Sequence, residues 1–180
     1  MVFGLFRRSV EAPYALYGAI VAQARHPALY ATLDVPDSLD GRFDMIVLHA
    51  VLVFRRLRGE APAVAERAQA LFDLFMADMD RSLREMGVGD LTVPKRIKKM
   101  AEAFYGRLDA YVAALDAGDR AALADALARN VFPDGAPPTI GRLAAYAAAA
   151  ADRLAAMATD DVIDGRITFP DPATAEALPS

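Results

Sequence analysis

The sequence has no cysteine among its 180 residues and only two histidines, His26 and His49. Without cysteine, the chain forms no disulfide, thiolate zinc site, iron–sulfur cluster or cysteine nucleophile. Neither histidine belongs to a Glu-x-x-His or His-Glu-x-x-His pattern, the patterns with which helical bundles bind metals. We therefore expect no metal site. A chain without cysteine also suits a reducing compartment, and we expect a cytoplasmic protein.

The chain has no excess of positive charge either. Its 20 Lys and Arg residues are outnumbered by 24 Asp and Glu residues, which gives a formal net charge of −4. Neutralising nucleic-acid phosphates requires a basic surface or a concentrated basic face. The composition therefore argues against a DNA-binding protein, and any contact with RNA or a membrane must come from a local patch.

Long hydrophobic runs are missing as well. The most apolar stretch, residues 45–54, is bounded by Asp44 and Arg55 and falls short of the roughly 20 residues that cross a bilayer. It predicts a buried core helix. The N-terminus resembles a signal peptide in part, but Glu11 and Pro13 interrupt the pattern, and we expect a structural helix there.

Strand signals are nearly absent, whereas helical periodicity recurs along the chain. With 55% apolar residues there is ample material for one core. We predict an all-α fold, a single compact bundle of about six helices over residues 1–158. From 159 to 180 the composition shifts to Asp, Gly and Pro, which predicts an extended or disordered tail.

Start and stop signals place the six helices. The first begins near Pro13 and breaks at His26-Pro27, and the others follow at about 38–58, 62–86, 93–117, 120–131 and 140–157. The predicted N-caps are Asp37 or Ser38, Thr92, Asp119 and Thr139, and the predicted helix stops are Gly59, Gly87 and Gly118.

His49 lies in the middle of the most apolar helix, where a hydrogen-bonded core or groove histidine is the favoured interpretation. A triad of Ser38, His49 and an aspartate lacks a nucleophile-elbow sequence, so we do not expect an enzyme. The alternative function is a small-molecule or haem-binding bundle, in which His49 and a methionine supply axial ligands. No cofactor is expected otherwise.

The only dense basic cluster comprises Lys95, Arg96, Lys98 and Lys99. Ribosomal RNA, anionic lipid and an acidic partner are all open as its targets, and a merely solvated face is the plainer alternative. Four cations in the first turns of a helix oppose the helix macrodipole and so carry an energetic cost. This cost indicates either that the cluster has a functional role or that Asp90 and Glu102 neutralise it.

Several blocks of sequence carry a resemblance to a known family. They are residues 24–30, 40–49 and 71–90, Val93-Pro94-Lys95 and Phe104-Tyr105-Gly106-Arg107, and the most specific part is Leu83-Arg84-Glu85-Met86-Gly87-Val88-Gly89-Asp90. In this order, over about residues 14–158, the chain resembles the ubiquinol-cytochrome c chaperone family, in its bacterial branch.

The resemblance implies a non-catalytic chaperone that assists assembly of the respiratory cytochrome bc1 complex, complex III, by holding newly made cytochrome b or another hydrophobic client protein. It implies work at the inner face of the cytoplasmic membrane. The basic cluster, judged from its charge alone, is the candidate surface for contact with the ribosome or that membrane. A small co-chaperone, which mitochondrial relatives require, is a further partner that the resemblance suggests.

Two hypotheses follow for the partner-binding surface. A polar set forms either a client-facing network or an internal clamp of the bundle: Arg42, His49, Asp73, Asp80, Arg84, Glu85 and Asp90. The second hypothesis is an apolar groove that binds the client. It would be lined by the methionine-rich third helix, whose side chains repack readily, and by Phe6, Tyr14, Tyr17, Phe104 and Tyr105.

Overall fold

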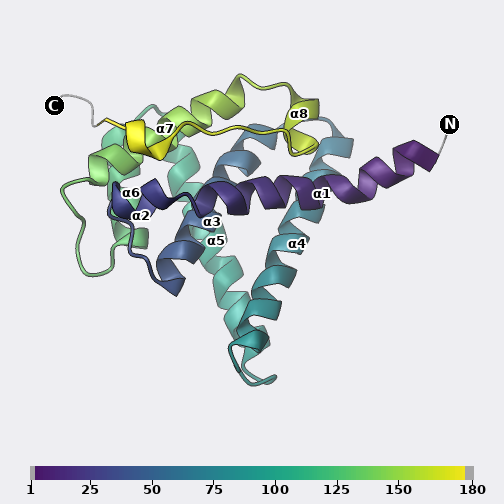
Figure 1. Ribbon diagram of the computed structural model, residues 1–180, viewed down its shortest axis with the longest axis horizontal. Helices are drawn as coiled ribbons and strands as arrows, with labels where there is room; N and C mark the ends of the chain where they lie inside the picture. The colour runs from purple at the N-terminus through teal and green to yellow at the C-terminus, as the bar shows by residue number, and fades with distance from the viewer. Residues whose placement is uncertain (1–2, 177–180) are drawn as a thin grey trace.

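A computed structural model describes the backbone of residues 3–176 and the side chains of residues 12–176. This part of the chain is all-α, which confirms the predicted fold class. Six helices of 12 or more residues form the bundle, and two five-residue helices, α2 and α8, add to them. In chain order (Figure 1) the elements are α1 (Phe3–Ala24), α2 (Pro27–Ala31), α3 (Leu39–Leu57), α4 (Pro62–Glu85), α5 (Val93–Asp116), α6 (Arg120–Val131), α7 (Ile140–Ala155), α8 (Thr159–Ile163) and the 3-10 turn η1 (Pro172–Thr174).

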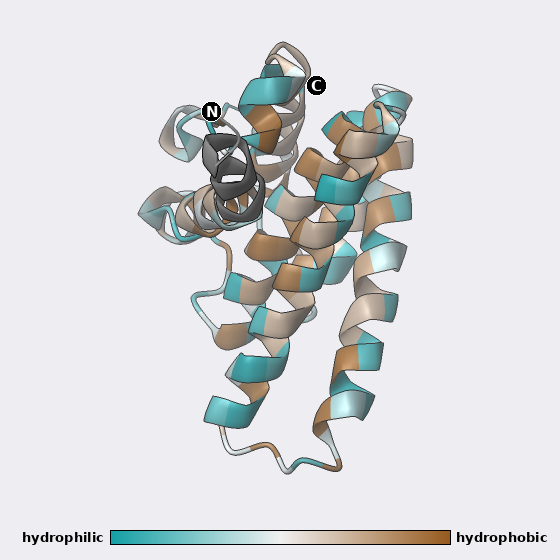
Figure 2. Ribbon diagram, turned by 90° about the vertical axis from the view of Figure 1, so that its right-hand side faces the viewer, coloured by the Kyte–Doolittle hydropathy of each residue, from teal (hydrophilic) through white to brown (hydrophobic). Residues whose placement is uncertain are grey.

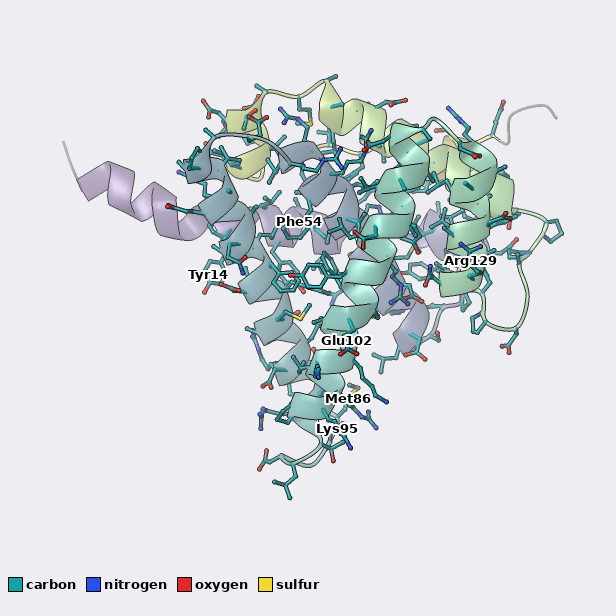
Figure 3. The ribbon with its side chains drawn as sticks, turned by 180° about the vertical axis from the view of Figure 1, so that it is seen from behind. Tyr14, Phe54, Met86, Lys95, Glu102 and Arg129 are labelled. Atoms are coloured by element: carbon teal, nitrogen blue, oxygen red, sulfur yellow. The ribbon has the colours of Figure 1, made fainter. Side chains whose placement is uncertain are left out.

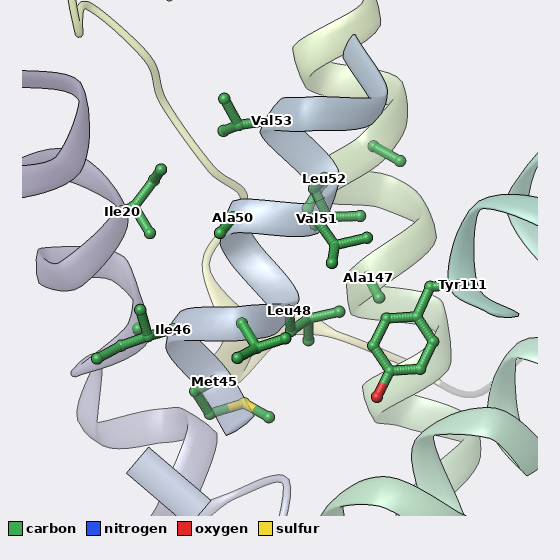
Figure 4. Packing of buried hydrophobic residues seen from close by; sticks show 14 of the residues in the cluster. Ile20, Met45, Ile46, Leu48, Ala50, Val51, Leu52, Val53, Tyr111 and Ala147 are labelled. Carbon is green, nitrogen blue, oxygen red and sulfur yellow. The ribbon is translucent and has the colours of Figure 1, made fainter. Parts of the chain in front are cut away.

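Helix α3 is the centre of the bundle, because α1, α4, α5, α6 and α7 all pack against it. Every residue from Met45 to Val53 is buried, so this stretch of the helix is covered on all sides, as the hydrophobic run predicted. In Figure 4, Ile46 lies on the side of α3 that faces Ile20 of α1, and Val51 lies toward Tyr111 of α5.

The local signals for helix ends are largely confirmed. Ser38 Oγ accepts a hydrogen bond from the Gly41 amide at 3.1 Å, and Asp119 Oδ1 accepts one from the Ala122 amide at 2.9 Å. All three predicted stop glycines have a left-handed φ, at Gly59, Gly87 and Gly118. Thr139 occupies its predicted N-cap position, but its hydroxyl donates to the Asp34 carboxylate at 2.8 Å instead of capping α7.

The predicted start of the first helix is wrong. Helix α1 begins at Phe3 and continues through Pro13. A proline removes one amide donor, and the helical residues on both sides carry the helix past it. The predicted break at His26-Pro27 is a corner between two helices: Pro27 opens α2, and His26 Nδ1 accepts a hydrogen bond from the Ala28 amide at 3.3 Å.

The end of the chain is irregular over most of residues 164–176, as predicted, but it departs from a disordered tail because it packs on the core and begins with a short helix. Residues 159–163 form α8, which buries Val162 and Ile163, and the following irregular stretch packs Ile167 and Phe169 against the core. The two apolar side chains hold this stretch against the core. The high content of Asp, Gly and Pro in the same stretch had predicted a tail without such contacts. The segment runs beside α1 in Figure 1.

Gly165 turns this segment against α1, with a φ of +75°. A Cβ atom there would lie 2.6 Å from the backbone of both Ala15 and Leu16. We expect Gly165→Ala to lower the free energy of unfolding by about 1–2 kcal/mol for the positive φ and by about 1–3 kcal/mol more for the forced backbone shift.

Gly59→Ala is the matched control, because Gly59 has a φ of +79° and no atom within 4 Å of the added Cβ. Urea unfolding of both variants isolates the contact with α1. Equal losses for the two substitutions would show that the segment does not press on that helix.

Helices α4 and α5 pack side by side as an antiparallel pair that projects from the rest of the bundle (Figure 1), and residues 86–92 join them at its far end. We call this pair the hairpin. Figure 2 shows it as the two long ribbons whose joining loop contains hydrophobic residues. Across residues 3–176, none of the helices has both the length and the apolar composition needed to cross a bilayer.

Candidate functional site

The first predicted site residue, His49, lies in the core and is fully buried. Its Nδ1 donates to the Met45 carbonyl at 2.7 Å, so Nε2 is the acceptor of the neutral ring. Nε2 therefore accepts the hydroxyl proton of Tyr146 at 2.7 Å, and the Tyr146 oxygen accepts from Gln23 Nε2 at 2.9 Å. This directional chain joins α1, α7 and α3.

Burial lowers the pKa of His49 to about 4, so the ring is neutral near pH 7. The edge of the His49 ring also meets Phe169, with ring centroids 5.1 Å apart. Both ring nitrogens are engaged, so His49 has none to offer a haem iron in this fold. Of the two roles considered for it, an internal clamp fits this placement and contact with a client does not.

The structure brings together three other predicted residues at the end of the hairpin. Arg84 Nε donates to Asp80 Oδ2 at 2.6 Å, and Arg84 Nη1 donates to Asp90 Oδ1 at 2.6 Å. The hydrogen bond from Arg84 holds the pKa of Asp80 below its ordinary value. Because these side chains are exposed, they add little to stability; they tie the last turn of α4 to the loop that follows it.

Two of the remaining polar residues of the predicted set, Arg42 and Asp73, lie apart from this corner, whereas Glu85 lies next to it. Arg42 is exposed and pairs with Asp37 at 2.7 Å, with its guanidinium 5.8 Å from the centre of the Tyr30 ring. Asp73 Oδ1 accepts a hydrogen bond from Gln69 Nε2 at 2.8 Å, and Glu85 is exposed at the end of α4. The predicted network is thus divided among the core, the hairpin end and two other surface positions.

The basic cluster is exposed on the first two turns of α5. At 100° per residue, its four members cover one half of the helix, and the partly buried Ile97 faces the bundle on the other half. Lys98 lies 3.9 Å from Glu102, so one carboxylate neutralises part of the cluster. The cluster comprises Lys95, Arg96, Lys98 and Lys99.

A groove at the base of the hairpin was not predicted as such. It has a volume of about 330 Å³ and lies between α3, α4 and α5. Phe104 forms its buried floor, and Phe54, Phe72 and Tyr105 surround it with ring centroids 5.3–5.7 Å from that of Phe104. Such tilted and edge-on pairs are the favoured aromatic geometries. We call this cavity the aromatic groove.

The aromatic residues predicted to receive a client only partly coincide with the groove. Tyr105 lines it and is 52% exposed, whereas Phe104 is buried beneath it. Tyr17 instead donates a hydrogen bond to Asp78 at 2.8 Å. Tyr14 is exposed on α1 and does not line the groove, and Figure 3 labels it apart from Phe54 of the groove. Phe6 lies outside the residues whose side chains are described. Phe54 and Phe72 were missed because their periodic spacing indicates only a core position.

A buried ion pair was also missed. Arg107 Nη2 donates to Asp44 Oδ1 at 2.7 Å, and both side chains are largely buried between α5 and α3. Burial raises the pKa of Asp44 to about 6, and the nearby Arg107 limits that rise. The two residues are 63 positions apart, so no local pattern reveals the pair.

The fold and these surfaces define an all-α helical bundle with an aromatic groove and a basic hairpin end. A profile of the family described as ubiquinol-cytochrome C chaperone matches residues 31–169. The chain belongs to the ubiquinol-cytochrome c chaperone family, as its sequence blocks predicted.

A solved structure supports the same assignment. The crystal structure of the Cbp3 homolog from Brucella abortus superimposes with a TM-score of 0.87 at 43% sequence identity, over 98% of this chain and 100% of that one. The search of curated proteins returned no significant match. The whole bundle, including the hairpin and the C-terminal segment, therefore has a counterpart of nearly equal extent.

Proposed function

We propose that this protein is a non-catalytic assembly chaperone of the cytochrome bc1 complex and that newly made cytochrome b is its client. The observation that carries the proposal is membership of the ubiquinol-cytochrome c chaperone family over most of the chain. The bc1 complex is the ubiquinol-cytochrome c reductase from which the family description takes its name, and cytochrome b is the client that the sequence resemblance implies.

The aromatic groove is where an apolar client segment docks. Its walls come from three helices that also build the core, so the groove is preformed and binding does not require the bundle to reorganise. It accommodates a few side chains, which suits one face of an amphipathic or apolar helix with anchors at positions i, i+3 or i+4.

The polar rim of the groove sets how a segment approaches. Arg55 and Arg58 both donate to Asp116, at 2.9 and 2.7 Å. Arg58 and Asp116 are exposed and Arg55 is partly exposed, so charged groups lie beside the apolar floor. In such an arrangement the buried centre supplies affinity and the charged edge supplies orientation.

Tyr105→Asp tests this site. Tyr105 is 52% exposed, so the substitution is expected to leave the fold intact, while a carboxylate in the groove repels an apolar segment. We expect capture of newly translated cytochrome b to fall at least about tenfold, the effect of losing an aromatic anchor. Thermal unfolding is measured on the same samples.

Tyr14→Asp is the matched control, because Tyr14 is 64% exposed and lines no part of the groove. It is expected to capture cytochrome b like the unchanged protein. Undiminished capture by Tyr105→Asp, or equal losses for both tyrosines, would contradict docking in the groove.

The assembly role itself is tested in cells. Deleting the gene is expected to lower the amount of assembled bc1 complex, and restoring the unchanged protein, but not Tyr105→Asp, to recover it. Normal assembly after deletion would rule out the proposed role.

We also propose that the chaperone works at the inner face of the cytoplasmic membrane, where cytochrome b inserts. That a small co-chaperone acts with it stays a prediction.

A further inference from the structure

The loop at the far end of the hairpin exposes large apolar side chains. Leu91 is 98% exposed and Met86 is 48% exposed. The loop has a fixed shape, because the Thr92 and Val93 amides both donate to the Gly89 carbonyl, at 2.7 and 3.2 Å. Leu91 therefore lies in water, in the loop at the end of the projecting hairpin (Figure 1), and contributes nothing to the core.

Positive charge is concentrated just behind this loop. All three lysines of the chain lie between positions 95 and 99, next to Arg96. They fall within about 9 Å of the start of α5, at 1.5 Å per residue. Residues 80–102 carry six cations and four carboxylates, although the whole chain has a formal charge of −4. The hairpin end therefore carries a net positive charge in an acidic protein, and Figure 3 labels both Lys95 and Met86 at this end.

We propose that the hairpin end docks on the surface of an anionic lipid bilayer. Leu91 and Met86 enter the boundary between headgroups and acyl chains, and the cations behind them contact the lipid phosphates. An apolar edge with flexible cations one or two turns away is the arrangement that interfacial proteins use. The membrane location rests on the proposed function, whereas the contact itself rests on the hairpin alone.

The same surface fits RNA less well. Single-stranded RNA is bound by stacking bases on aromatic side chains beside cations, and residues 77–103 contain no aromatic residue. An exposed leucine gains nothing from a phosphate backbone, but it gains from an apolar phase. The exposed carboxylate of Asp90 is paired with Arg84 at 2.6 Å, so it does not oppose an anionic surface as a free charge.

Co-sedimentation of the full chain with vesicles tests the proposal. We expect binding to vesicles of phosphatidylcholine with phosphatidylglycerol, weak binding to phosphatidylcholine alone, and release by salt. Leu91→Asp is expected to weaken binding about tenfold or more. Each cation replaced by glutamine among the four is expected to weaken it about fivefold.

Leu39→Asp is the matched control, because Leu39 is 63% exposed on a different helix. It is expected to bind vesicles as the unchanged chain does. Failure of the unchanged chain to bind anionic vesicles, or equal binding by Leu91→Asp, overturns the proposal. Capture of an RNA oligonucleotide that depends on the cations but not on Leu91, without vesicle binding, overturns it in favour of RNA.

Lysine labelling gives a second reading that does not depend on sedimentation. Lys95, Lys98 and Lys99 are the only lysines, so an amine reagent modifies these side chains and the N-terminal amine, and mass spectrometry of the peptides reports the three lysines separately. Anionic vesicles are expected to protect them several-fold. Tyr105→Asp is expected to retain this protection, so loss of client binding and loss of membrane binding are distinguishable.

Discussion

Replacing Arg107 with methionine is expected to lower the free energy of unfolding by about 3–5 kcal/mol near pH 8, because it leaves a buried carboxylate without its partner. Asp44 and Arg107 are 8% and 14% exposed, so water does little to replace the lost interaction. Methionine retains most of the apolar volume of the arginine stem, which isolates the charge from the packing.

The loss is expected to depend on pH in a defined direction. The pKa of Asp44 in the folded protein is about 6, raised by burial and limited by Arg107. Without the arginine, this pKa rises further. Below about pH 6, Asp44 is protonated in both folded proteins and the variant loses least; as the pH increases beyond that value, only the unchanged protein gives up the proton, and the difference grows.

Urea unfolding at pH 5 and pH 8 measures this difference. The double variant Asp44→Asn/Arg107→Met removes both charges and is expected to recover most of the stability, because the unpaired carboxylate is the cause. An equal loss at the two pH values, or a double variant as unstable as Arg107→Met alone, would contradict the explanation.

His49→Leu is expected to make stability less sensitive to acid. The folded protein keeps His49 neutral, with a pKa of about 4 against 6.5 for the ordinary side chain. The unfolded chain therefore takes up a proton first, and the stabilising effect of the neutral ring is lost as the pH falls from about 6.5 to about 4. This amounts to about 3 kcal/mol, at 1.36 kcal/mol per pH unit.

At pH 7.5 the same variant is expected to be less stable by about 1–3 kcal/mol, because the buried Tyr146 hydroxyl loses its acceptor. His49→Gln is the control, since its side-chain oxygen can accept from Tyr146 and it does not titrate. It is expected to cost less at pH 7.5 and to share the reduced acid sensitivity. A His49→Leu variant with the acid sensitivity of the unchanged protein would contradict a neutral buried ring.

Asp44 and His49 act in opposite directions over the same pH range. Between about pH 4 and pH 6, the raised pKa of Asp44 makes stability decrease with pH, whereas the lowered pKa of His49 makes it increase. Their effects offset each other in the unchanged protein. Each variant must therefore be compared with the unchanged protein at the same pH, because the overall profile conceals both groups.

The sequence by itself determined the features that depend on neighbours within about four residues. The serine and aspartate caps, the three stop glycines and the buried apolar helix from 45 to 53 are all local, and the structure contains each of them. The family was also recognisable, because its blocks are runs of consecutive residues that the matched segment largely contains.

Only the tertiary structure decided which distant side chains meet. His49 forms a hydrogen bond with Tyr146, 97 positions away, and Asp44 pairs with Arg107, 63 positions away, because α3 packs against both α7 and α5. The same packing leaves Phe72 and Tyr105 around a groove instead of inside the core, and it leaves Leu91 exposed at the end of the hairpin. Helical periodicity predicts which face of a helix is apolar. Which element covers that face, or whether any element does, depends on how the helices pack together.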